Sequence, residues 1–281
     1  MGKTPKSYED RVAEIAANAS PSVAMILIAD KKGNYAGSGT GFFVSKEGNF
    51  VTNKHVVANA FSAQIVSDEE LIEVKGYYPD QSDVDLVVLK ADGEKKRFKP
   101  LAIADSRQVK FFQRVVVIGY PQGLELGLGM EPDVAAGNVN QIRKLQVGKG
   151  EVRLFQFDCR VDQGSSGSPV LNLDGGVIGV ASASTIVHGI NLALPSEYIP
   201  IPKDERIVPL PFGNAIESSV IVDRAKTIIK ELKPNAKDVL SALLFIIFGL
   251  FTSIREGLLN ILVNLWHSIY LLFTTILRLF S

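Results

Sequence analysis

Apolar residues along the first two thirds of the chain gather in short runs that turn-forming residues separate. Runs such as SVAMILIA (22–29), RVVVIGY (114–120) and INLALP (190–195) are rich in Val, Ile and Leu, with Gly, Pro, Asn and Asp between them. About a dozen such runs occur, which is typical of β-sandwiches and barrels rather than of alternating strands and helices. The pattern predicts an all-β fold, and two barrels of about six strands each would fit it.

Apolar residues recur at helical spacing on either side of this β-rich region. YEDRVAEIAANA (8–19) predicts a short helix that ends at Ser20-Pro21, and NAIESSVIVDRAKTIIKEL (214–232) predicts an amphipathic helix. Composition then divides the chain into four parts. These are an N-terminal helix (1–20), a β-rich domain (21–202), a charged linker with the amphipathic helix (203–238) and an apolar helical tail (239–281).

The tail at 239–281 carries Arg255, Glu256 and Arg278 as its formal charges. Its run at 258–277 is long enough for one helix to cross the hydrocarbon core of a bilayer. Because so few charges remain to face solvent, association with a membrane is favoured. The alternative is a helical bundle in water, which would join copies of the chain into a homo-oligomer.

Charge and cysteine content narrow the classes of partner and compartment. The chain holds 30 basic and 30 acidic residues, whereas a nucleic-acid-binding protein usually has a basic excess or stripe. Cys159 is the single cysteine, so no intramolecular disulfide can form, and this suits a reducing compartment. The N-terminus lacks the apolar run of a secretory signal. We therefore expect no nucleic-acid partner, and a membrane-associated protein whose β-rich domain faces the cytoplasm.

Ser166 in DQGSSGSPV (162–170) is the candidate nucleophile. A serine hydroxyl needs a neighbouring base, and histidine has the suitable pKa. Three histidines are available. NFVTNKHVV (49–57) is a predicted strand that carries His55 near its end, His188 lies in a predicted loop or strand edge, and His267 lies in the tail. Any of these residues taken alone is more often structural than catalytic.

An acidic residue within DVDLVVLK (83–90) completes a candidate triad. Asp85 is the preferred partner for His55, and Asp83 is the competitor. The order His, Asp, Ser on a chain of short strands is the order of chymotrypsin-like enzymes, and it differs from the orders in two unrelated hydrolase folds. The motif around Ser166 reads G-x-S-G-x-P, not the G-x-S-x-G of an α/β-hydrolase.

Five ordered blocks of the chain resemble the HtrA/Deg-type trypsin-like serine proteases. They are GSGTGFFVSKEGNFVTNKHVV (37–57), DVDLVVLK (83–90), RVVVIGYPQGLELGL (114–128), FDCRVDQGSSGSPVLNLDGGVIGVASA (157–183) and NLALPSEYI (191–199). The resemblance covers residues from about 10 to 202 and implies two perpendicular six-stranded antiparallel β-barrels with the active site between them.

The resemblance also implies the roles of individual residues. His55 would be the general base, Asp85 the carboxylate that orients it and Ser166 the nucleophile. The backbone N–H groups of Gly164 and Ser166 would form the oxyanion hole. No metal or cofactor is expected. Ser168 stands where the family usually has glycine, and we expect this small residue to be tolerated.

Substrate contacts are predicted along VASAS (180–184), where a peptide would add as an extended strand to Ala181, Ser182 and Ala183. Arg160 lies six residues before Ser166, where the template has its specificity pocket. Arg160 would either make that pocket basic or point away to solvent or to a carboxylate, and the second arrangement is favoured.

The function predicted is that of a membrane-attached serine endopeptidase acting on proteins or peptides. Residues 203–238 are too few for the PDZ domain that this family usually carries, so attachment by the tail is expected to take its place. The alternatives are a catalytically silent, protease-like peptide-binding module, and a protease sensor coupled to a membrane-active tail.

Overall fold

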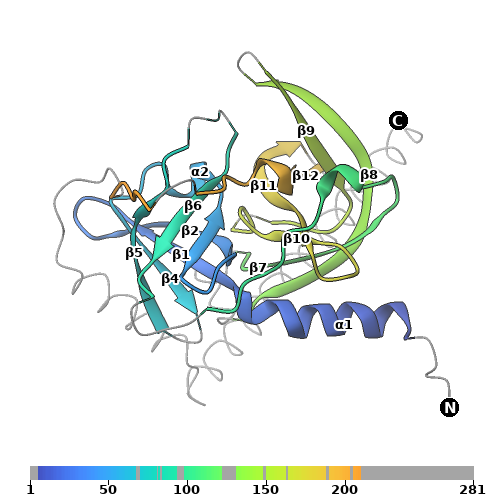
Figure 1. Ribbon diagram of the computed structural model, residues 1–281, viewed down its shortest axis with the longest axis horizontal. Helices are drawn as coiled ribbons and strands as arrows, with labels where there is room; N and C mark the ends of the chain where they lie inside the picture. The colour runs from blue at the N-terminus through green and yellow to red at the C-terminus, as the bar shows by residue number, and fades with distance from the viewer. Residues whose placement is uncertain are drawn as a thin grey trace, which may run out of the picture. The chain divides into compact units, whose positions relative to one another are not determined.

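Two closed antiparallel barrels of six strands each make up most of the described chain, as the sequence predicts (Figure 1). The computed structural model describes residues 6–67, 70–80, 82, 84–93, 98–121, 131–147, 150–162, 164–187, 190–202 and 205–209. The predictions for Asp83, His188, the helix at 214–232 and the tail at 239–281 lie outside the described residues.

The first barrel contains the N-terminal half of the fold. Its strands, in the order in which they pair around the barrel, are β1 (Val23–Ala29), β2 (Tyr35–Phe43), β3 (Asn49–Thr52), β6 (Val87–Ala91), β5 (Glu70–Tyr77) and β4 (Ser62–Ser67). Pairing of β1 with β4 closes the sheet. A closed barrel has no free strand edge to pair with another chain.

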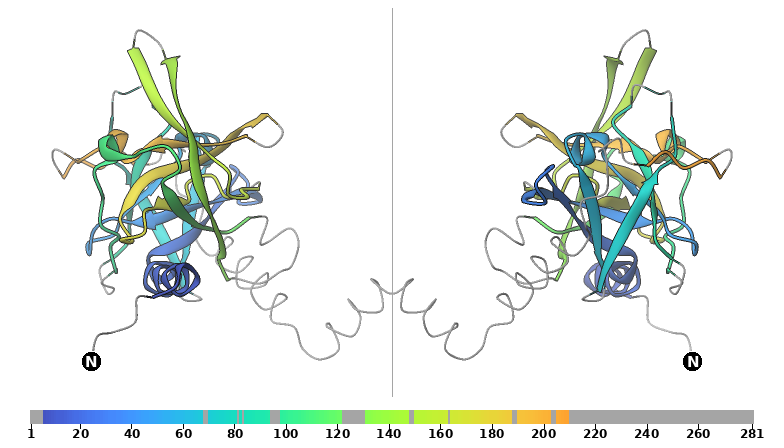
Figure 2. Two further views of the ribbon diagram at one scale, coloured as in Figure 1. Left: turned by 90° about the vertical axis from the view of Figure 1, so that its right-hand side faces the viewer. Right: turned by 90° about the vertical axis from the view of Figure 1, so that its left-hand side faces the viewer.

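The second barrel follows with the same number of strands. They pair in the order β10 (Pro169–Leu171), β11 (Val177–Val187), β12 (Ile190–Pro195), β9 (Gly150–Phe157), β8 (Asp133–Val147) and β7 (Arg114–Gly119). Strands β8 and β9 are paired from Val139↔Phe157 to Val147↔Gly150. Their outer part forms a twisted two-stranded ribbon that extends past the other strands of the barrel (Figure 2).

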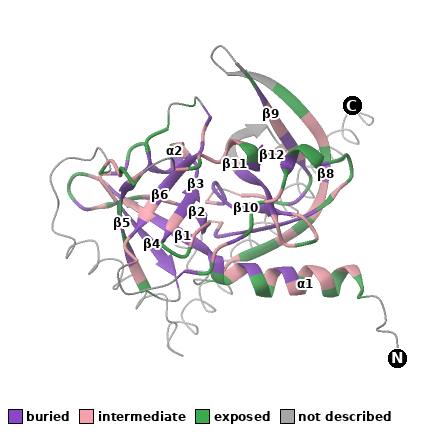
Figure 3. Ribbon diagram, in the orientation of Figure 1, coloured by how far each residue is buried: buried purple, intermediate pink, exposed green. Residues whose placement is uncertain are grey.

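Alternation along β1 explains how the barrels share a hydrophobic core. Ala24 and Ile26 pack inside the first barrel, whereas Met25 and Leu27 belong to a cluster that includes Val116 and other residues of the second barrel. Successive side chains of a strand point to opposite faces. Both faces of β1 are therefore buried (Figure 3), and each fully buried apolar side chain of this size contributes about 1.5–3 kcal/mol.

Helix α1 (Tyr8–Ala19) packs on the second barrel, although the first barrel follows it in the chain (Figure 1). Ser7 begins the helix with a capping box, in which its side chain accepts from Asp10 N–H and Asp10 accepts from Ser7 N–H. The guanidinium of Arg114 in β7 lies 3.9 Å from the centre of the Tyr8 ring. The predicted N-terminal helix is thus confirmed, and the structure gives it a docking surface.

A segment after the second barrel returns to the first. Val208 and Tyr77 of β5 exchange two backbone hydrogen bonds of 2.9 Å. Gly76 permits this approach, because a Cβ there would collide with the carbonyl oxygen of Val208. Each barrel is therefore contacted by the chain segment that flanks the other barrel.

The strand predicted across residues 49–57 ends earlier than expected. Strand β3 stops at Thr52, Asn53 stays extended, and Lys54–Val57 form the helical turn α2. Val56 and Val57 are buried among the apolar residues of the first barrel. His55 consequently lies on a helical turn rather than directly at a strand end.

In the described part of the chain, three 3-10 turns complete the regular structure: η1 (Ser20–Ser22), η2 (Ser106–Gln108) and η3 (Ser196–Tyr198). Among the described ranges given above, no helix has the length and apolar character needed to cross a membrane.

Candidate active site

His55 and Asp85 are brought together by the first barrel alone. The backbone N–H of His55 donates to Asp85 Oδ1 at 2.9 Å, and His55 Nδ1 lies 2.6 Å from Asp85 Oδ2. Asn53, which is completely buried, donates from its side-chain amide to the backbone oxygen of Asp85 at 2.9 Å. Two hydrogen bonds therefore hold the Asp85 carboxylate against α2, and a third holds the backbone of Asp85.

Ser166 of the second barrel reaches this pair. Its Oγ lies 3.0 Å from His55 Nε2. With Nδ1–H donating to the Asp85 carboxylate, the neutral imidazole presents the lone pair of Nε2 to the serine hydroxyl. This is the arrangement in which a histidine can accept the proton of an attacking serine.

Exposure differs across the three residues. Ser166 is 7% exposed, whereas the side chains of His55 and Asp85 are 37% and 32% exposed. The hydroxyl is thus placed on a buried turn, while one side of the imidazole remains open to a substrate. The structure brings together all three residues of the predicted triad.

Glycines shape the turn that carries Ser166. Ser165 N–H donates to Asp162 O at 3.0 Å, which closes a four-residue turn with Gly164 at its third position and a φ of 93°. A positive φ at that position is what a type II turn requires, and glycine adopts it without steric cost. Gly167 has a φ of 92°, and a Cβ there would collide with the carbonyl oxygen of Thr40.

Strand β11 supports the same turn from the other side. Ala181 O accepts from Gly167 N–H at 2.9 Å, and Ala181 N–H donates to Ser168 O at 2.8 Å. Both backbone groups of Ala181 therefore hold the Ser166 turn in place. Ser182 pairs with Leu192 of β12, and Ala183 follows in β11; a contact of these residues with substrate stays a prediction.

Arg160 takes the second of its two predicted arrangements. Its side chain is 86% exposed, and its Nε donates to Asp162 at 2.7 Å. Arg160 thus pairs with a carboxylate at the surface, and its contact with a substrate stays a prediction.

Ser168 is completely buried and lies beside β7. A Cβ on Gly119 would collide with Ser168 Oγ, so the glycine of β7 leaves the space that the serine fills. Strand β10 begins immediately afterwards and pairs Pro169 with Val180. Tolerance of this small residue stays a prediction, and the space at Gly119 supports it.

Three polar residues of the site were not singled out by sequence reasoning. Thr40, Thr52 and Asn53 are completely buried in the first barrel. Thr40 N–H donates to Ser166 O at 2.8 Å, and Thr52 Oγ1 donates to Thr40 O at 2.7 Å. Polar side chains within apolar strand runs were the available signal, because buried polar groups must find partners.

Comparison with known proteins can now be set beside this geometry. A family model described as trypsin-like peptidase domain matches residues 39–180, half of the chain. The chain belongs to the trypsin-like peptidase family. This trypsin-like domain holds the whole His55–Asp85–Ser166 constellation within the matched residues.

Relatives and solved structures agree with that membership. A probable periplasmic serine endoprotease DegP-like of Rhizobium meliloti is 35% identical over 159 residues, which are 56% of this chain and 30% of the relative. Serine protease HTRA1 of Xenopus laevis is 28% identical over 209 residues, 70% of this chain and 43% of the relative. The chain thus spans less than half the length of either.

The fold also resembles that of Deg5, whose crystal structure superposes with a TM-score of 0.56 at 26% identity and covers 69% of this chain and 93% of the other. The relatives of this trypsin-like domain are therefore serine proteases of the HtrA/Deg type, as its sequence motifs predict.

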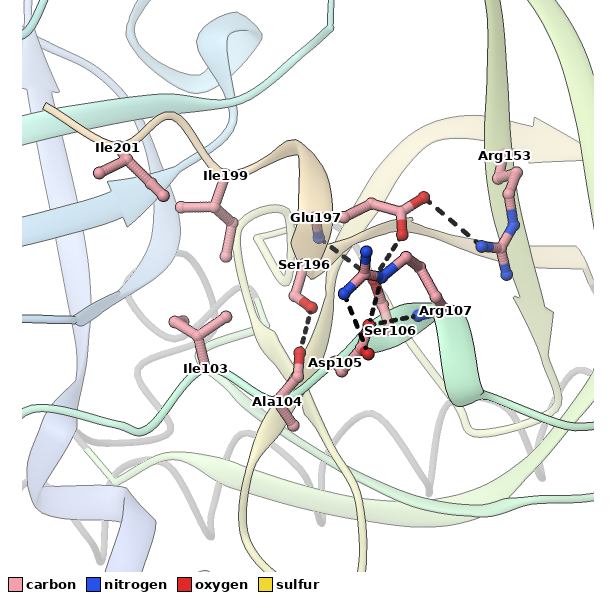
Figure 4. Close-up of a pocket in the computed structure, with 10 residues that line it drawn as sticks. All are labelled: Ile103, Ala104, Asp105, Ser106, Arg107, Arg153, Ser196, Glu197, Ile199 and Ile201. Atoms are coloured by element: carbon pink, nitrogen blue, oxygen red, sulfur yellow. Dashed lines mark hydrogen bonds and ion pairs between the residues drawn. The ribbon is translucent and has the colours of Figure 1, made fainter. Parts of the chain in front are cut away.

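The second barrel has a further hollow of about 650 Å³ that contains none of the three residues (Figure 4). It is lined by Ile103, Ala104, Asp105, Ser106, Arg107, Arg153, Ser196, Glu197, Ile199 and Ile201. Arg107 donates to Asp105 at 2.8 Å, and Arg153 pairs with Glu197 at 3.5 Å. The hydrogen bonds from Arg107 lower the pKa of Asp105 to about 2. The charges of this wall are thus paired with one another.

Among the described residues, no group of three or more His, Cys, Asp or Glu side chains is arranged to hold a metal ion.

Proposed function

We propose that this trypsin-like domain is a serine endopeptidase that uses Ser166, His55 and Asp85. The observation that carries the proposal is the unbroken chain of contacts from Asp85 Oδ2 through His55 to Ser166 Oγ, at 2.6 and 3.0 Å. Both distances fall within the reach of a hydrogen bond that can carry a proton.

In the proposed acylation step, Ser166 Oγ attacks the scissile carbonyl carbon while its proton passes to His55 Nε2. Asp85 keeps the imidazole in the required tautomer and stabilises the imidazolium that forms. His55 then gives the proton to the leaving amine, and the C–N bond breaks. An acyl-Ser166 ester remains, and the same histidine activates the water that hydrolyses it.

The negative oxygen of the tetrahedral intermediate needs hydrogen-bond donors. The backbone N–H groups of Gly164 and Ser166 are proposed for this role, because the turn at Gly164 lies directly before the nucleophile. Each such donor lowers the barrier by about 3 kcal/mol. Protein substrates are proposed by analogy with the named proteases, and an extended peptide beside β11 is the expected way of binding.

A fluorophosphonate probe tests the nucleophile. The wild-type protein should be labelled and should hydrolyse casein, and Ser166→Ala should do neither. Ser165→Ala is the matched control, because Ser165 is 5% exposed in the same turn and its side chain has no role in the proposed chemistry. Equal labelling of the wild type and Ser166→Ala would contradict the assignment.

Attachment to a membrane through residues 239–281 is a separate proposal that rests on the apolar composition of that segment. We further propose that the peptidase domain lies on the cytoplasmic side, which its single cysteine suits. Carbonate extraction of a fluorescent fusion, followed by protease protection of sealed vesicles, tests attachment and side. Release of the fusion by carbonate would refute membrane attachment. If the peptidase domain faces the cytoplasm, it should be protected from added protease inside right-side-out vesicles.

A further inference from the structure

Thr40 in β2 is completely buried, and each of its polar groups makes a hydrogen bond. Its N–H donates to Ser166 O at 2.8 Å. Its hydroxyl donates to Gly164 O at 2.9 Å and accepts from Tyr120 N–H at 2.9 Å. Its carbonyl oxygen accepts from Thr52 Oγ1 at 2.7 Å.

The direction of the hydroxyl hydrogen bond follows from these partners. A threonine hydroxyl has one proton to donate and lone pairs with which to accept. Because Tyr120 N–H can only donate, Thr40 Oγ1 accepts from it and its single proton is directed to Gly164 O. When one hydroxyl accepts one hydrogen bond and donates another, each bond strengthens the other.

This hydroxyl fixes a peptide unit of the proposed oxyanion turn. The Gly164 carbonyl shares its planar peptide with the N–H of Ser165, which donates to Asp162. The unit is therefore held at both ends, and Thr40 N–H holds the carbonyl of Ser166 as well. Thr40 thus ties the backbone on both sides of Ser165 to the barrel that carries His55.

We infer that Thr40 is a positioning residue for the oxyanion turn, an inference that rests on the proposed function. The nucleophile and the proposed hole belong to the second barrel, whereas the base belongs to the first. The side chain of Thr40 sets the position of the nucleophile and the proposed oxyanion hole relative to the base. A displacement of about 1 Å in such a constellation can cost about 100-fold in rate.

The test compares Thr40→Val, which keeps the shape and removes the hydroxyl, with Thr40→Ser, which keeps the hydroxyl. We expect T40V to lower kcat on a casein-derived peptide by about 100-fold, while KM changes by less than about 3-fold. A peptide boronate that forms a tetrahedral adduct with Ser166 should lose affinity by the same factor as kcat. T40S should restore most of both, and the acidic limb of the pH profile should not move, because the base is held within the first barrel.

Ile65→Val is the control for stability, since Ile65 is completely buried inside the first barrel and away from the turn. T40V and I65V should melt at similar temperatures, and I65V should keep the wild-type kcat. The inference is overturned if T40V keeps kcat within about 3-fold, or if T40S is impaired as much as T40V. An equal loss of kcat in I65V would also overturn it.

If T40V does not fold, Thr40→Ala carries the same expectation, and failure of both to fold would assign Thr40 to the fold rather than to the turn. The proposed function is judged separately by Ser166-dependent labelling of the wild type. A wild type that is labelled, with an unimpaired T40V, refutes the positioning role alone.

Discussion

The two barrels hold their shares of the active site in different ways. In the first barrel, His55 is joined to Asp85, and Asp85 to Asn53, by hydrogen bonds that do not leave the barrel. In the second, the turn around Ser166 receives bonds from its own β11 and also from Thr40 of the first barrel. The proposed base is therefore positioned within one barrel, whereas the proposed nucleophile is held by both.

This difference indicates what each barrel would contribute to the proposed reaction. The orientation of the proposed base depends on local packing of α2 against the segment that carries Asp85. The position of the nucleophile depends on the contact between the barrels, so a change in that contact should affect Ser166 and Gly164 before it affects His55. Variants that disrupt the His55–Asp85 pair and the Ser166 turn separately test this difference between the barrels.

The largest loss of activity is expected from Asp85→Asn, which disrupts the His55–Asp85 pair of the first barrel. The amide would favour the wrong imidazole tautomer, and kcat should fall by about 10⁴, the loss found in the serine-protease template. Steady-state hydrolysis of a casein-derived peptide measures it. Asp83→Asn is the matched control from the same segment and should keep activity near the wild-type level; the reverse result would make Asp83 the orienting carboxylate.

A change at the contact between the barrels should come next. In Gly167→Ala, the alanine would have to adopt a φ of 92°, which L-residues rarely do. Its Cβ would also collide with the carbonyl oxygen of Thr40. We expect a loss of unfolding free energy on the order of 3 kcal/mol and slower labelling by a fluorophosphonate. Chemical denaturation and labelling kinetics measure the two effects.

Gly175→Ala separates strain from collision in that experiment. Gly175 has a φ of 79°, but a Cβ there meets nothing within 4 Å. This variant should lose only about 1 kcal/mol and should be labelled at the wild-type rate. If both glycine variants lose equal stability and labelling rate, the contact with Thr40 is not what holds the turn.

The interior of the second barrel holds Cys159, which is 2% exposed. Burial, with a smaller effect of Asp158, raises the pKa of its thiol to about 12. An unfolded thiol has a pKa of about 8.5, so native Cys159 should react with iodoacetamide at about pH 9 roughly 10³-fold more slowly than the unfolded chain.

The sign of the linked stability follows from the same shift. Because the folded-state pKa is raised, the stability from the buried neutral thiol is fully present below about pH 8.5 and is lost as the pH rises towards about 12. Cys159→Ala should flatten this part of the stability curve. Equal alkylation of native and unfolded protein at about pH 9 would show that the interior is open to solvent.

Sequence patterns predicted most of the fold because the strand signal is local. Short apolar runs predicted about a dozen strands, and the described residues form twelve. The order His55, Asp85, Ser166 pointed to the three residues that the structure brings together. The end of β3 was placed too late, since Val56 and Val57 suit a strand by composition but pack into the barrel from a helical turn.

The sequence by itself determined that the chain is built from short strands, and which serine, histidine and carboxylate are able to work together. Only the tertiary structure decided that Thr40 would hold the turn of Ser166 and that Gly119 would make room for Ser168. The physical reason is that these contacts join residues far apart in the chain, where hydrogen-bond geometry and close packing depend on how the two barrels meet.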